Sequence, residues 1–541
     1  MKKLLALVLA LLMALSLVAC GEQTPTGEYA GKTIVLHTND VHGNIAYYAY
    51  IAGLKDQYAA EGAEVILADA GDFSQGTVYV SSSKGADAVT MLNAAGYDVL
   101  TLGNHEFDYG WAQAKENLAA FNGKVVCANV LENGAPIYDG HTIIKKGRVK
   151  IGFFGLDTPE AQTKANPALI QGLTFLAGEE LYACAQAQAD ALKKEGADIV
   201  ICLAHLGMDE SSAPNRSTDL LANTTGIDFI IDGHSHTMAV ATAETPIQST
   251  ESNLAYIGMV TIDNKTKAIE GYDLLPTPVE VKEGEEAPVI EMPTNAAVAA
   301  AAQEIMDRID AEYGTVFAKS EVTLNGEKAP NGNRDSETNN GDIITDSMLW
   351  ALTEQQPGSI EGVDAANIVA ITNGGGIRAA INPGDITKKD VKTVLPFGNT
   401  LAVVYVKGSV LLEALEASTF CTPESVGAFP QTAGMEWTLN TKAAFDQGEA
   451  YPDSTYFAPK SINRVSIQSV NGKAFDENAE YAVITNNFLA AGGDTYYAFA
   501  ASSGYDTGLA MDEVLMAYIT EKLGGTIGAD YAEPQSRMTL K

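Results

Sequence analysis

Short clusters of asparagine, aspartate and histidine recur through the first half of the chain. One of them, TLGNHEFDYG at 101–110, brings Asn104, His105 and Asp108 within five residues. An amide oxygen can bind a metal ion, and an imidazole can donate a proton or a hydrogen bond to a phosphate. A carboxylate three residues on can hold that imidazole in one tautomer. A polar loop with Asn and Asp as caps has the same composition, so the interpretation depends on the other clusters.

The other clusters contain the remaining side chains of a metal site. Asp40 and His42 are two apart, and residues i and i+2 of an extended segment point the same way, so both can reach one cation. Asp72 has two oxygens and can bridge two cations. The candidate ligands, which with His105 include five of the seven histidines, are Asp40, His42, Asp72, Asn104, His205, His234 and His236. This mixture of carboxylate, amide and imidazole suits two ions of zinc, manganese or iron better than calcium or a structural zinc.

Such a ligand set predicts the hydrolysis of phosphate esters. Two cations about 3.5–4 Å apart can generate hydroxide at neutral pH and clamp the attacking and leaving oxygens of the ester. His105 is not needed as a ligand if Asn104 binds the metal. It is then free to neutralise the phosphate or protonate the leaving oxygen, with Asp108 fixing its orientation.

The clusters follow apolar runs that are typical of β-strands. Runs at 33–37, 65–68, 98–102, 125–128, 150–154, 199–204 and 229–231 are separated by helical stretches such as 179–195. After a spacer at 21–30, this alternation predicts an α/β domain over 31–275, with helices on both faces of a sheet. In open α/β sheets the site lies beyond the carboxyl ends of the strands, which is where the clusters fall.

The segment 276–315 predicts a linker and a bridging helix. Residues 276–294 contain four prolines and five glutamates without periodicity, and residues 295–313 are Ala-rich with helical periodicity. The remainder, 316–541, is predicted to be a second, smaller α/β domain. Its glycines at 374–376 lack the spacing of a dinucleotide fingerprint, and no Walker lysine motif is present.

Composition and the N-terminal segment limit which partners and which cellular compartment the protein can have. The 541 residues include 34 basic and 69 acidic ones, a formal charge of −35, which excludes a basic groove for a nucleic-acid polymer. Two lysines and an apolar run at 4–19, short for a membrane span, predict a signal segment over 1–20 and export. No C-x-x-C pair occurs. Buried free thiols are favoured, with a disulfide left open, for Cys127, Cys184, Cys202 and Cys421.

The motifs D-x-H, G-D, G-N-H-E-F-D, A-H and G-H-S-H, in this order, resemble those of the calcineurin-like metallophosphoesterases. The second domain narrows the resemblance to the 5′-nucleotidase and UDP-sugar hydrolase family of exported bacterial and surface-bound animal enzymes, from about Lys32 to Leu540. It implies a four-layer sheet-and-helix first domain joined by a helical linker to the smaller domain. It assigns one metal to Asp40, His42, Asp72 and His236, the other to Asp72, Asn104, His205 and His234, and the catalytic dyad to His105 and Asp108.

The resemblance also implies substrate contacts in the second domain. Phe397 and Phe488 match rings that sandwich the base, Asn399 a base contact and Asp494 an acceptor for a ribose hydroxyl. The full set is Arg334, Asn373, Arg378, Phe397, Asn399, Phe488 and Asp494. Pro330 stands where some members have a further arginine, which leaves the preference for mono-, di- or triphosphates open.

The resemblance implies an activity, a location and alternatives. The activity is metal-dependent hydrolysis of nucleoside 5′-monophosphates, with di- and triphosphates or UDP-sugars as further candidate substrates. Leu17-Val18-Ala19-Cys20 resembles a bacterial lipoprotein signal, which predicts a lipid anchor on Cys20 at the outer face of the cell membrane or on its periplasmic side. One alternative is a 2′,3′-cyclic nucleotide phosphodiesterase with 3′-nucleotidase activity, against which Asp108 weighs because those relatives often have asparagine there. The other is an inactive surface protein that binds nucleosides or a host partner, against which the complete ligand set weighs.

Overall fold

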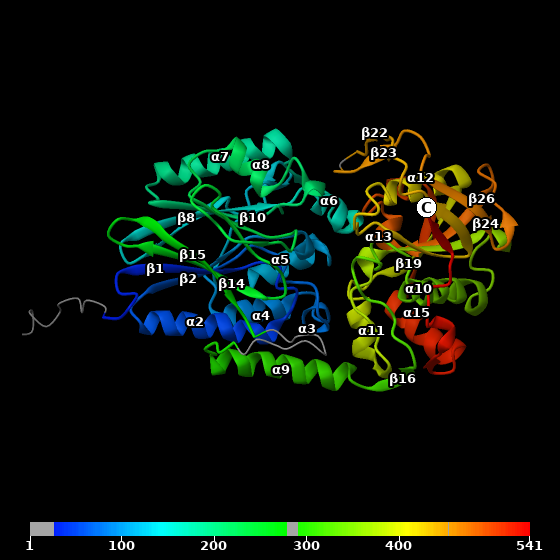
Figure 1. The fold of residues 1–541 in the computed structure, drawn as a ribbon, viewed down its shortest axis with the longest axis horizontal. Coiled ribbons are helices and arrows are strands. Elements are labelled where there is room, and N and C mark those ends of the chain that lie inside the picture. Colours follow the sequence, from blue (N-terminus) through cyan, green and yellow to red (C-terminus); the bar gives the residue numbers. More distant parts are fainter. Residues whose placement is uncertain (1–25, 279–289, 453) are drawn as a thin grey trace, which may run out of the picture.

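Two six-stranded sheets form the centre of the first of two lobes (Figure 1). The computed structural model describes residues 26–278, 290–452 and 454–541. The first sheet has the order β15-β14-β1-β2-β3-β4, with β1 (Lys32–Thr38), β2 (Glu64–Asp69), β3 (Val99–Leu100), β4 (Lys124–Val125), β14 (Tyr256–Asp263) and β15 (Ala268–Pro276). The second has the order β12-β13-β11-β10-β8-β7, with β7 (His141–Lys146), β8 (Val149–Asp157), β10 (Ile199–His205), β11 (Phe229–Asp232), β12 (Met238–Ala239) and β13 (Ile247–Thr250).

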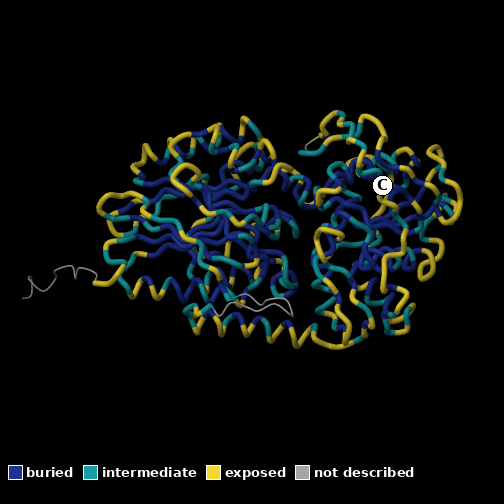
Figure 2. Tube along the Cα trace, in the orientation of Figure 1, coloured by how far each residue is buried: buried dark blue, intermediate teal, exposed yellow. Residues whose placement is uncertain are grey.

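The two sheets face each other across an apolar core, and helices cover their outer faces. Val35 and Ile66 of the first sheet share this core with Phe153 and Leu203 of the second. The neighbouring residues Ile34 and Leu67 point the other way and pack with the helices α2 (Tyr48–Ala60), α4 (Ala86–Ala95) and α9 (Ala296–Tyr313). On the far side, the helices α7 (Gly178–Lys194) and α8 (Ser217–Asn223) cover the second sheet. The buried strands lie inside and the exposed helix faces outside (Figure 2).

This arrangement confirms the α/β class and the four-layer first domain. The expectation of one sheet with helices on both faces was wrong, because each sheet has a helical layer on one face and the other sheet on its second face. A strand with two apolar faces indicates burial on both sides, but it does not say whether a helix or a sheet covers them.

Parallel pairing brings the polar clusters to one edge. β1 pairs in parallel with β2, and β10 pairs in parallel with both β8 and β11. The carboxyl ends of these strands therefore point the same way, and the loops that follow them gather at the side of the lobe that faces the second lobe (Figure 1).

Helix α9 connects the lobes. Asn295 caps it, with its side-chain oxygen accepting from the backbone N–H groups of Ala297 and Val298. Its apolar face, including Val298 and Ile305, packs in the first-lobe core, and the chain then enters β16 (Val316–Ser320) of the second lobe. The predicted bridging helix is thus present, while part of the predicted linker, 279–289, lies outside the described residues.

The second lobe has a five-stranded sheet of order β20-β17-β26-β19-β27, formed by β17 (Ile368–Asn373), β19 (Thr400–Lys407), β20 (Pro430–Ala433), β26 (Glu480–Asn486) and β27 (Ser503–Ala510). One face packs against α10 (Asn339–Trp350), α11 (Lys388–Val394) and α15 (Met511–Ala517). The other packs against α12 (Gly408–Ser418) and a small sheet containing β21 (Met435–Leu439) and β24 (Val465–Val470). A hairpin of β22 (Gln447–Ala450) and β23 (Phe457–Pro459) projects from this lobe.

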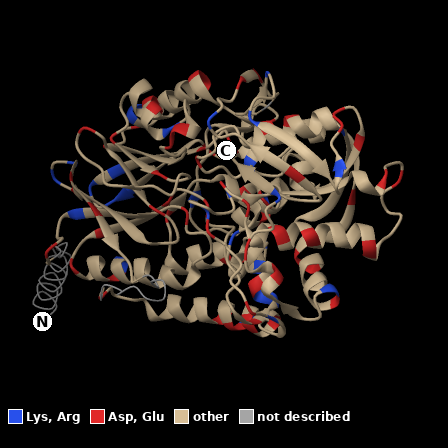
Figure 3. Ribbon diagram, turned by 45° about the vertical axis from the view of Figure 1, so that its right-hand side comes forward, with Lys and Arg blue, Asp and Glu red and all other residues tan. Residues whose placement is uncertain are grey.

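Acidic residues are spread over both lobes (Figure 3). Among the described residues, no helix is long and apolar enough to cross a membrane. The signal segment and Cys20 lie outside the described residues. The four described cysteines are free thiols. Cys127 and Cys202 are buried as expected, whereas Cys184 and Cys421 are only partly buried.

Candidate active site

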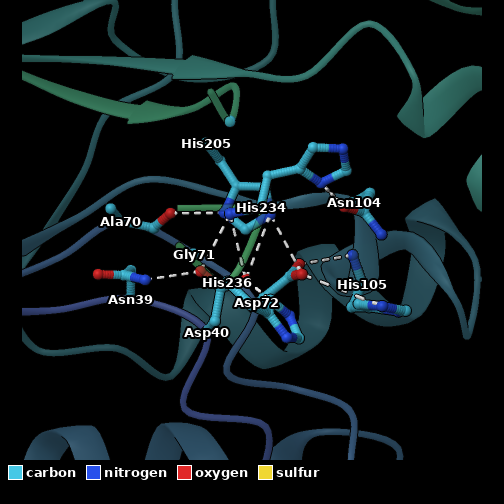
Figure 4. Close-up of polar contacts among 12 residues, drawn as sticks. Asn39, Asp40, Ala70, Gly71, Asp72, Asn104, His105, His205, His234 and His236 are labelled. Carbon is cyan, nitrogen blue, oxygen red and sulfur yellow. Dashed lines mark hydrogen bonds and ion pairs between the residues drawn. The ribbon is translucent and has the colours of Figure 1, made fainter. Parts of the chain in front are cut away.

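The loops after the parallel strands bring the predicted ligands together (Figure 4). Ligand atoms of Asp40, Asp72 and His205 lie within 4.8 Å of one another, and so do those of Asp40, His42 and His236. The Nε2 atom of His205 is 3.1 Å from Asp72 Oδ2, and that of His236 is 3.5 Å from Asp40 Oδ1. These side chains come from four strand ends that are far apart in the sequence.

The other two predicted ligands are adjacent to this group. His234 Nδ1 lies 2.8 Å from Asn104 Oδ1, across more than a hundred residues of sequence. Asn104 begins a short 3₁₀ turn, η2 (Asn104–Phe107), after Gly103. A Cβ atom at Gly103 would lie 2.4 Å from Asp72 Oδ1, so only glycine allows the Asn104 loop to approach Asp72 this closely.

The backbone at the ligands is unusual. Five of the seven have positive φ: Asp40 (48°), His42 (47°), Asp72 (62°), His234 (78°) and His236 (53°). Residues with a Cβ atom adopt this conformation at a cost, and such residues cluster where the surrounding structure holds a functional geometry.

The donor set fits divalent cations. The buried Nε2 of His205 has no hydrogen-bond partner among the described residues. The Nε2 atoms of His42 and His236 face each other at 3.0 Å, an arrangement that a shared cation satisfies. Burial raises the pKa of Asp72, but His205 and His105 outweigh it and bring the pKa well below its usual range. Burial likewise opposes ionisation of Asp40, yet His205 and His236 lower its pKa to about 2. Both carboxylates are therefore negatively charged at neutral pH.

His105 and Asp108 form a close pair. His105 Nδ1 lies 2.6 Å from Asp108 Oδ2, and the backbone N–H of His105 donates to Asp72 Oδ1 at 2.9 Å. Burial lowers the pKa of His105, but Asp108 and Asp72 more than offset it, so the pKa is raised. His105 Nε2 is also 4.0 Å from Asp72 Oδ2 and groups with His42 and Asp72 as a candidate ligand. Geometry therefore brings the predicted dyad together, while its role as non-ligand stays a prediction.

Glu106 holds two loops of the site together through backbone hydrogen bonds, and it was not predicted from the sequence. Its Oε2 accepts from the backbone N–H groups of Asp72 (2.8 Å) and Gly103 (2.6 Å). Its Oε1 accepts from those of Phe73 and Ser74, both at 3.0 Å. One buried carboxylate thus ties the loop that carries Asp72 to the loop that carries Asn104 and His105. Its position between His105 and Phe107 in the motif was the available signal.

A cavity of about 440 Å³ lies between the lobes and joins the two halves of the predicted site. From the first lobe it is lined by Asp72, Asn104, His105, Asp108, His234 and His236. All seven predicted substrate residues line it from the second lobe: Arg334, Asn373, Arg378, Phe397, Asn399, Phe488 and Asp494.

Arginine side chains and aromatic rings line this cavity. The Phe397 ring stacks on His105, with ring centroids 6.0 Å apart, and the Arg378 guanidinium lies 5.7 Å from its centroid. Burial and the neighbouring Arg378 lower the pKa of Arg334 to about 9. These two arginines have no carboxylate partner among the described ion pairs, so the cavity favours an anion.

Further cavity residues were not anticipated. Glu160 Oε2 lies 3.3 Å from His234 Nε2, and Lys164 Nζ lies 3.8 Å from Asp494 Oδ1. Tyr456, in the loop between β22 and β23, contributes a ring. Both Glu160 and Lys164 follow β8, and the polar run Asp157–Glu160 at its end was the signal that could have identified them.

Comparisons with known proteins cover both lobes. Residues 34–238 match the family model "calcineurin-like phosphoesterase", and residues 316–501 match "5′-nucleotidase, C-terminal domain". A trifunctional nucleotide phosphoesterase protein of Bacillus subtilis is 30% identical over 91% of this chain and 34% of its own length, so this chain spans about a third of that relative. A snake venom 5′-nucleotidase of Crotalus adamanteus is 25% identical over 91% of this chain and 86% of its own. The crystal structure of a 5′-nucleotidase precursor from Thermus thermophilus is similar, with a TM-score of 0.72, 26% identity, and coverage of 94% of this chain and 99% of that one.

Proposed function

Because this chain belongs to the family in which a calcineurin-like phosphoesterase domain precedes a 5′-nucleotidase C-terminal domain, we propose that it hydrolyses nucleoside 5′-monophosphates to nucleosides and inorganic phosphate. It is a phosphoric monoester hydrolase, and relatives named 5′-nucleotidase align over most of both chains. The observation that carries the proposal is the shared cavity, because metal-type side chains of one lobe and candidate nucleoside contacts of the other line the same space.

We propose two divalent cations as cofactors. Asp40, His42, Asp72 and His236 would hold one, and Asp72, Asn104, His205 and His234 the other. The buried Nε2 of His205 supports this assignment, because it has no hydrogen-bond partner among the described residues and lies 3.1 Å from Asp72 Oδ2. The facing Nε2 atoms of His42 and His236 support it as well. Zinc, manganese and iron are the candidates that suit the donor set. When bound, the cations would supply hydroxide at neutral pH and positive charge for the phosphate oxygens.

The side chains of the protein would then orient the ester and donate a proton to its leaving oxygen. Asp108 holds the proton of His105 on Nδ1, which leaves Nε2 toward the cavity, where it can neutralise the phosphate or protonate the leaving ribose oxygen once the ring is charged. Arg334 and Arg378 would neutralise the phosphate. In the second lobe, Phe397 and Phe488 would stack on the base, Asn373 and Asn399 would position the nucleoside, and Asp494 would accept from a ribose hydroxyl.

A substrate panel tests the activity and separates it from the alternatives. We expect the purified enzyme, reconstituted in turn with zinc, manganese and iron, to release phosphate from 5′-AMP far faster than from 3′-AMP or 2′,3′-cyclic AMP. ADP, ATP and UDP-glucose in the same panel define the number of phosphates accepted. The Bacillus relative is named a trifunctional nucleotide phosphoesterase, so more than one phosphoesterase activity has to be measured. Cleavage of 3′-AMP and of the cyclic nucleotide tests the alternative function. A preference for 3′-AMP or the cyclic nucleotide would reject the proposal, and no turnover with any metal would favour the inactive binding protein.

We also propose that the protein is exported and anchored through a lipid on Cys20. The apolar run before Cys20 and the Leu-Val-Ala-Cys pattern support this location. Cys20→Ser should release the protein into the medium or periplasm, or leave its precursor uncleaved. Partitioning of a normally cleaved Cys20→Ser variant into detergent would contradict the anchor.

A further inference from the structure

We propose that Lys164 is a positioning residue for ribose recognition: its ammonium group holds the carboxylate of Asp494 in the orientation that accepts ribose hydroxyls. The inference rests on the proposed function, in which Asp494 contacts the ribose. It adds a first-lobe residue to a recognition site that is otherwise formed by the second lobe.

The backbones that carry the two residues are joined across the lobes. Lys164 ends the four-residue helix α6 (Ala161–Lys164), which lies at the boundary with the second lobe (Figure 1). The backbone N–H of Asp494 donates to the carbonyl oxygen of Thr163 at 2.7 Å. Thr163 and Asp494 are each only 4% exposed, so this hydrogen bond is shielded from water. The position of Asp494 relative to α6 is therefore well defined.

The Asp494 carboxylate is held from two sides. Its Oδ1 lies 3.8 Å from Lys164 Nζ, and its Oδ2 accepts from Asn373 Nδ2 at 3.0 Å. Asn373 is itself held, because its Oδ1 accepts from Asn486 Nδ2 at 3.1 Å. One oxygen thus has a cation beside it at ion-pair distance, and the other is hydrogen-bonded to an amide, so both oxygens have a neighbour that restrains the carboxylate. Each carboxylate oxygen has further acceptor capacity, which remains for a ligand hydroxyl.

Charge supports the same arrangement. Burial raises the pKa of Asp494, and Lys164 is the strongest influence that opposes this rise. The ammonium group of Lys164 also lies 5.5 Å from the centroid of the Tyr456 ring, within the range of a cation–π contact. A cation that is largely removed from water is costly unless it is paired, and the carboxylate it pairs with among the described residues is Asp494. Stability alone does not explain this pair, because apolar residues of similar volume usually replace such pairs at little cost.

The segment that carries Lys164 also reaches the metal cluster. Glu160, directly before α6, contacts His234 Nε2 at 3.3 Å, and His234 Nδ1 in turn contacts Asn104. The contact to a candidate metal ligand and the contact to the candidate ribose acceptor are therefore only four positions apart in the sequence. This short segment links the candidate metal site, where the phosphate would bind, to the candidate ribose site. Lys164 is the residue of the segment that contacts the ribose site.

The test compares AMP with a nucleotide that differs from it only in the ribose and with a phosphate ester that has no nucleoside. The full-length enzyme and the variants Lys164→Met, Lys164→Arg, Asp494→Asn and the Lys164→Met/Asp494→Asn double variant are assayed with 5′-AMP, 2′,3′-dideoxy-AMP and p-nitrophenyl phosphate. We expect Lys164→Met to lower kcat/KM for AMP about 10-fold, with little change for the other two substrates, because only AMP offers ribose hydroxyls to Asp494. Lys164→Arg should restore most of the loss. The double variant should be no worse than Asp494→Asn, because the two residues act as one unit.

Lys389 provides a matched control. It also joins the lobes, with its Nζ 2.8 Å from Asp310 Oδ1 and 5.5 Å from the centroid of the Tyr79 ring, but it does not line the cavity. Lys389→Met should leave the ratio of AMP to dideoxy-AMP unchanged, so a changed ratio in that variant would overturn a specific role for Lys164.

The remaining outcomes separate this inference from the proposed function. An unchanged AMP rate in Lys164→Met, or an equal fall for all three substrates, would overturn the role of Lys164 while the 5′-nucleotidase proposal stands. A wild-type enzyme that treats AMP and dideoxy-AMP alike would remove the ribose role of Asp494 and this inference with it. A wild-type enzyme inactive on AMP would reject both the proposed function and this inference.

Discussion

Replacing Glu106 by glutamine should both destabilise the first lobe and weaken metal binding. The carboxylate accepts four backbone hydrogen bonds, two on each oxygen. The glutamine amide keeps one oxygen and turns an NH₂ group toward the other two N–H donors. Two charge-assisted hydrogen bonds are lost, and two buried N–H groups are left without an acceptor.

The size of the effect follows from these contacts. A buried N–H group left unsatisfied costs about 1–3 kcal/mol, so two of them predict a loss of about 2–6 kcal/mol in the free energy of unfolding. The common anchor of the loops that carry Asp72 and His105 is also weakened, because only one side-chain oxygen still accepts. Removal of groups that orient metal ligands usually weakens metal affinity by about 10- to 100-fold, and we expect the same range here.

Urea unfolding of the metal-free protein and competitive metal titration measure the two effects of Glu106→Gln. The measurements belong at pH 8, because burial and the nearby Asp72 raise the pKa of Glu106 to about 7 and the comparison requires the carboxylate. Glu116→Gln, on the exposed face of the helix α5 (Trp111–Ala119), is the matched control and should change neither quantity. Unfolding within about 0.5 kcal/mol of wild type, the range of ordinary surface substitutions, together with unchanged metal affinity, would refute the role of Glu106 as the anchor of both loops.

Three further predictions follow from the site and the core. His105→Asn should keep its metal content and lose about 10²–10⁴-fold in turnover; metal analysis that finds one site emptied would make His105 a ligand. Phe488→Ala should lower kcat/KM for AMP about 5- to 150-fold, as expected for a lost base-stacking contact, with p-nitrophenyl phosphate scarcely affected, and equal losses would make the ring a core residue. Phe397→Ala is a less clean test, because that ring also stacks on His105. Burial lowers the pKa of His37 to about 4 from 6.5, so folding stability falls as the pH drops from 6.5 toward 4. Replacement by Gln should remove about 2–3 kcal/mol of the difference in unfolding free energy between pH 7.5 and 4.5, and an unchanged difference would contradict this.

The convergence of the metal-type residues could be predicted from the sequence because strand ends are local features. Asp40, Asp72 and His205 each lie within four residues of the end of an apolar run, and parallel pairing brings such positions to one edge whatever the details of packing. The two-residue spacings of Asp40 with His42 and of His234 with His236 did not mark extended strands, however. Those four residues lie in loops with positive φ, and their convergence depends on loop conformations that spacing alone does not determine.

The residues that were missed depend on strand length and on long-range contacts. The strand expected at 150–154 continues in β8 to Asp157, so the polar residues after it were not recognised as another strand end. The pairing of β8 with β10 places these polar residues at the site, because Asp157 is paired with His205. Glu106 could not be assigned from its sequence position, since three of its four hydrogen-bond donors are more than thirty residues away.

The left-handed backbone at five ligands limits how this site could be transplanted. A protein engineer who copied the seven side chains onto ordinary strand ends of another scaffold would obtain the right atoms aimed in the wrong directions, because side-chain direction follows φ and ψ. Each such residue costs about 1–3 kcal/mol unless its surroundings impose it. The transferable unit is therefore the set of loops together with Gly103 and Glu106, which hold Asp72 and Asn104 in their relative positions.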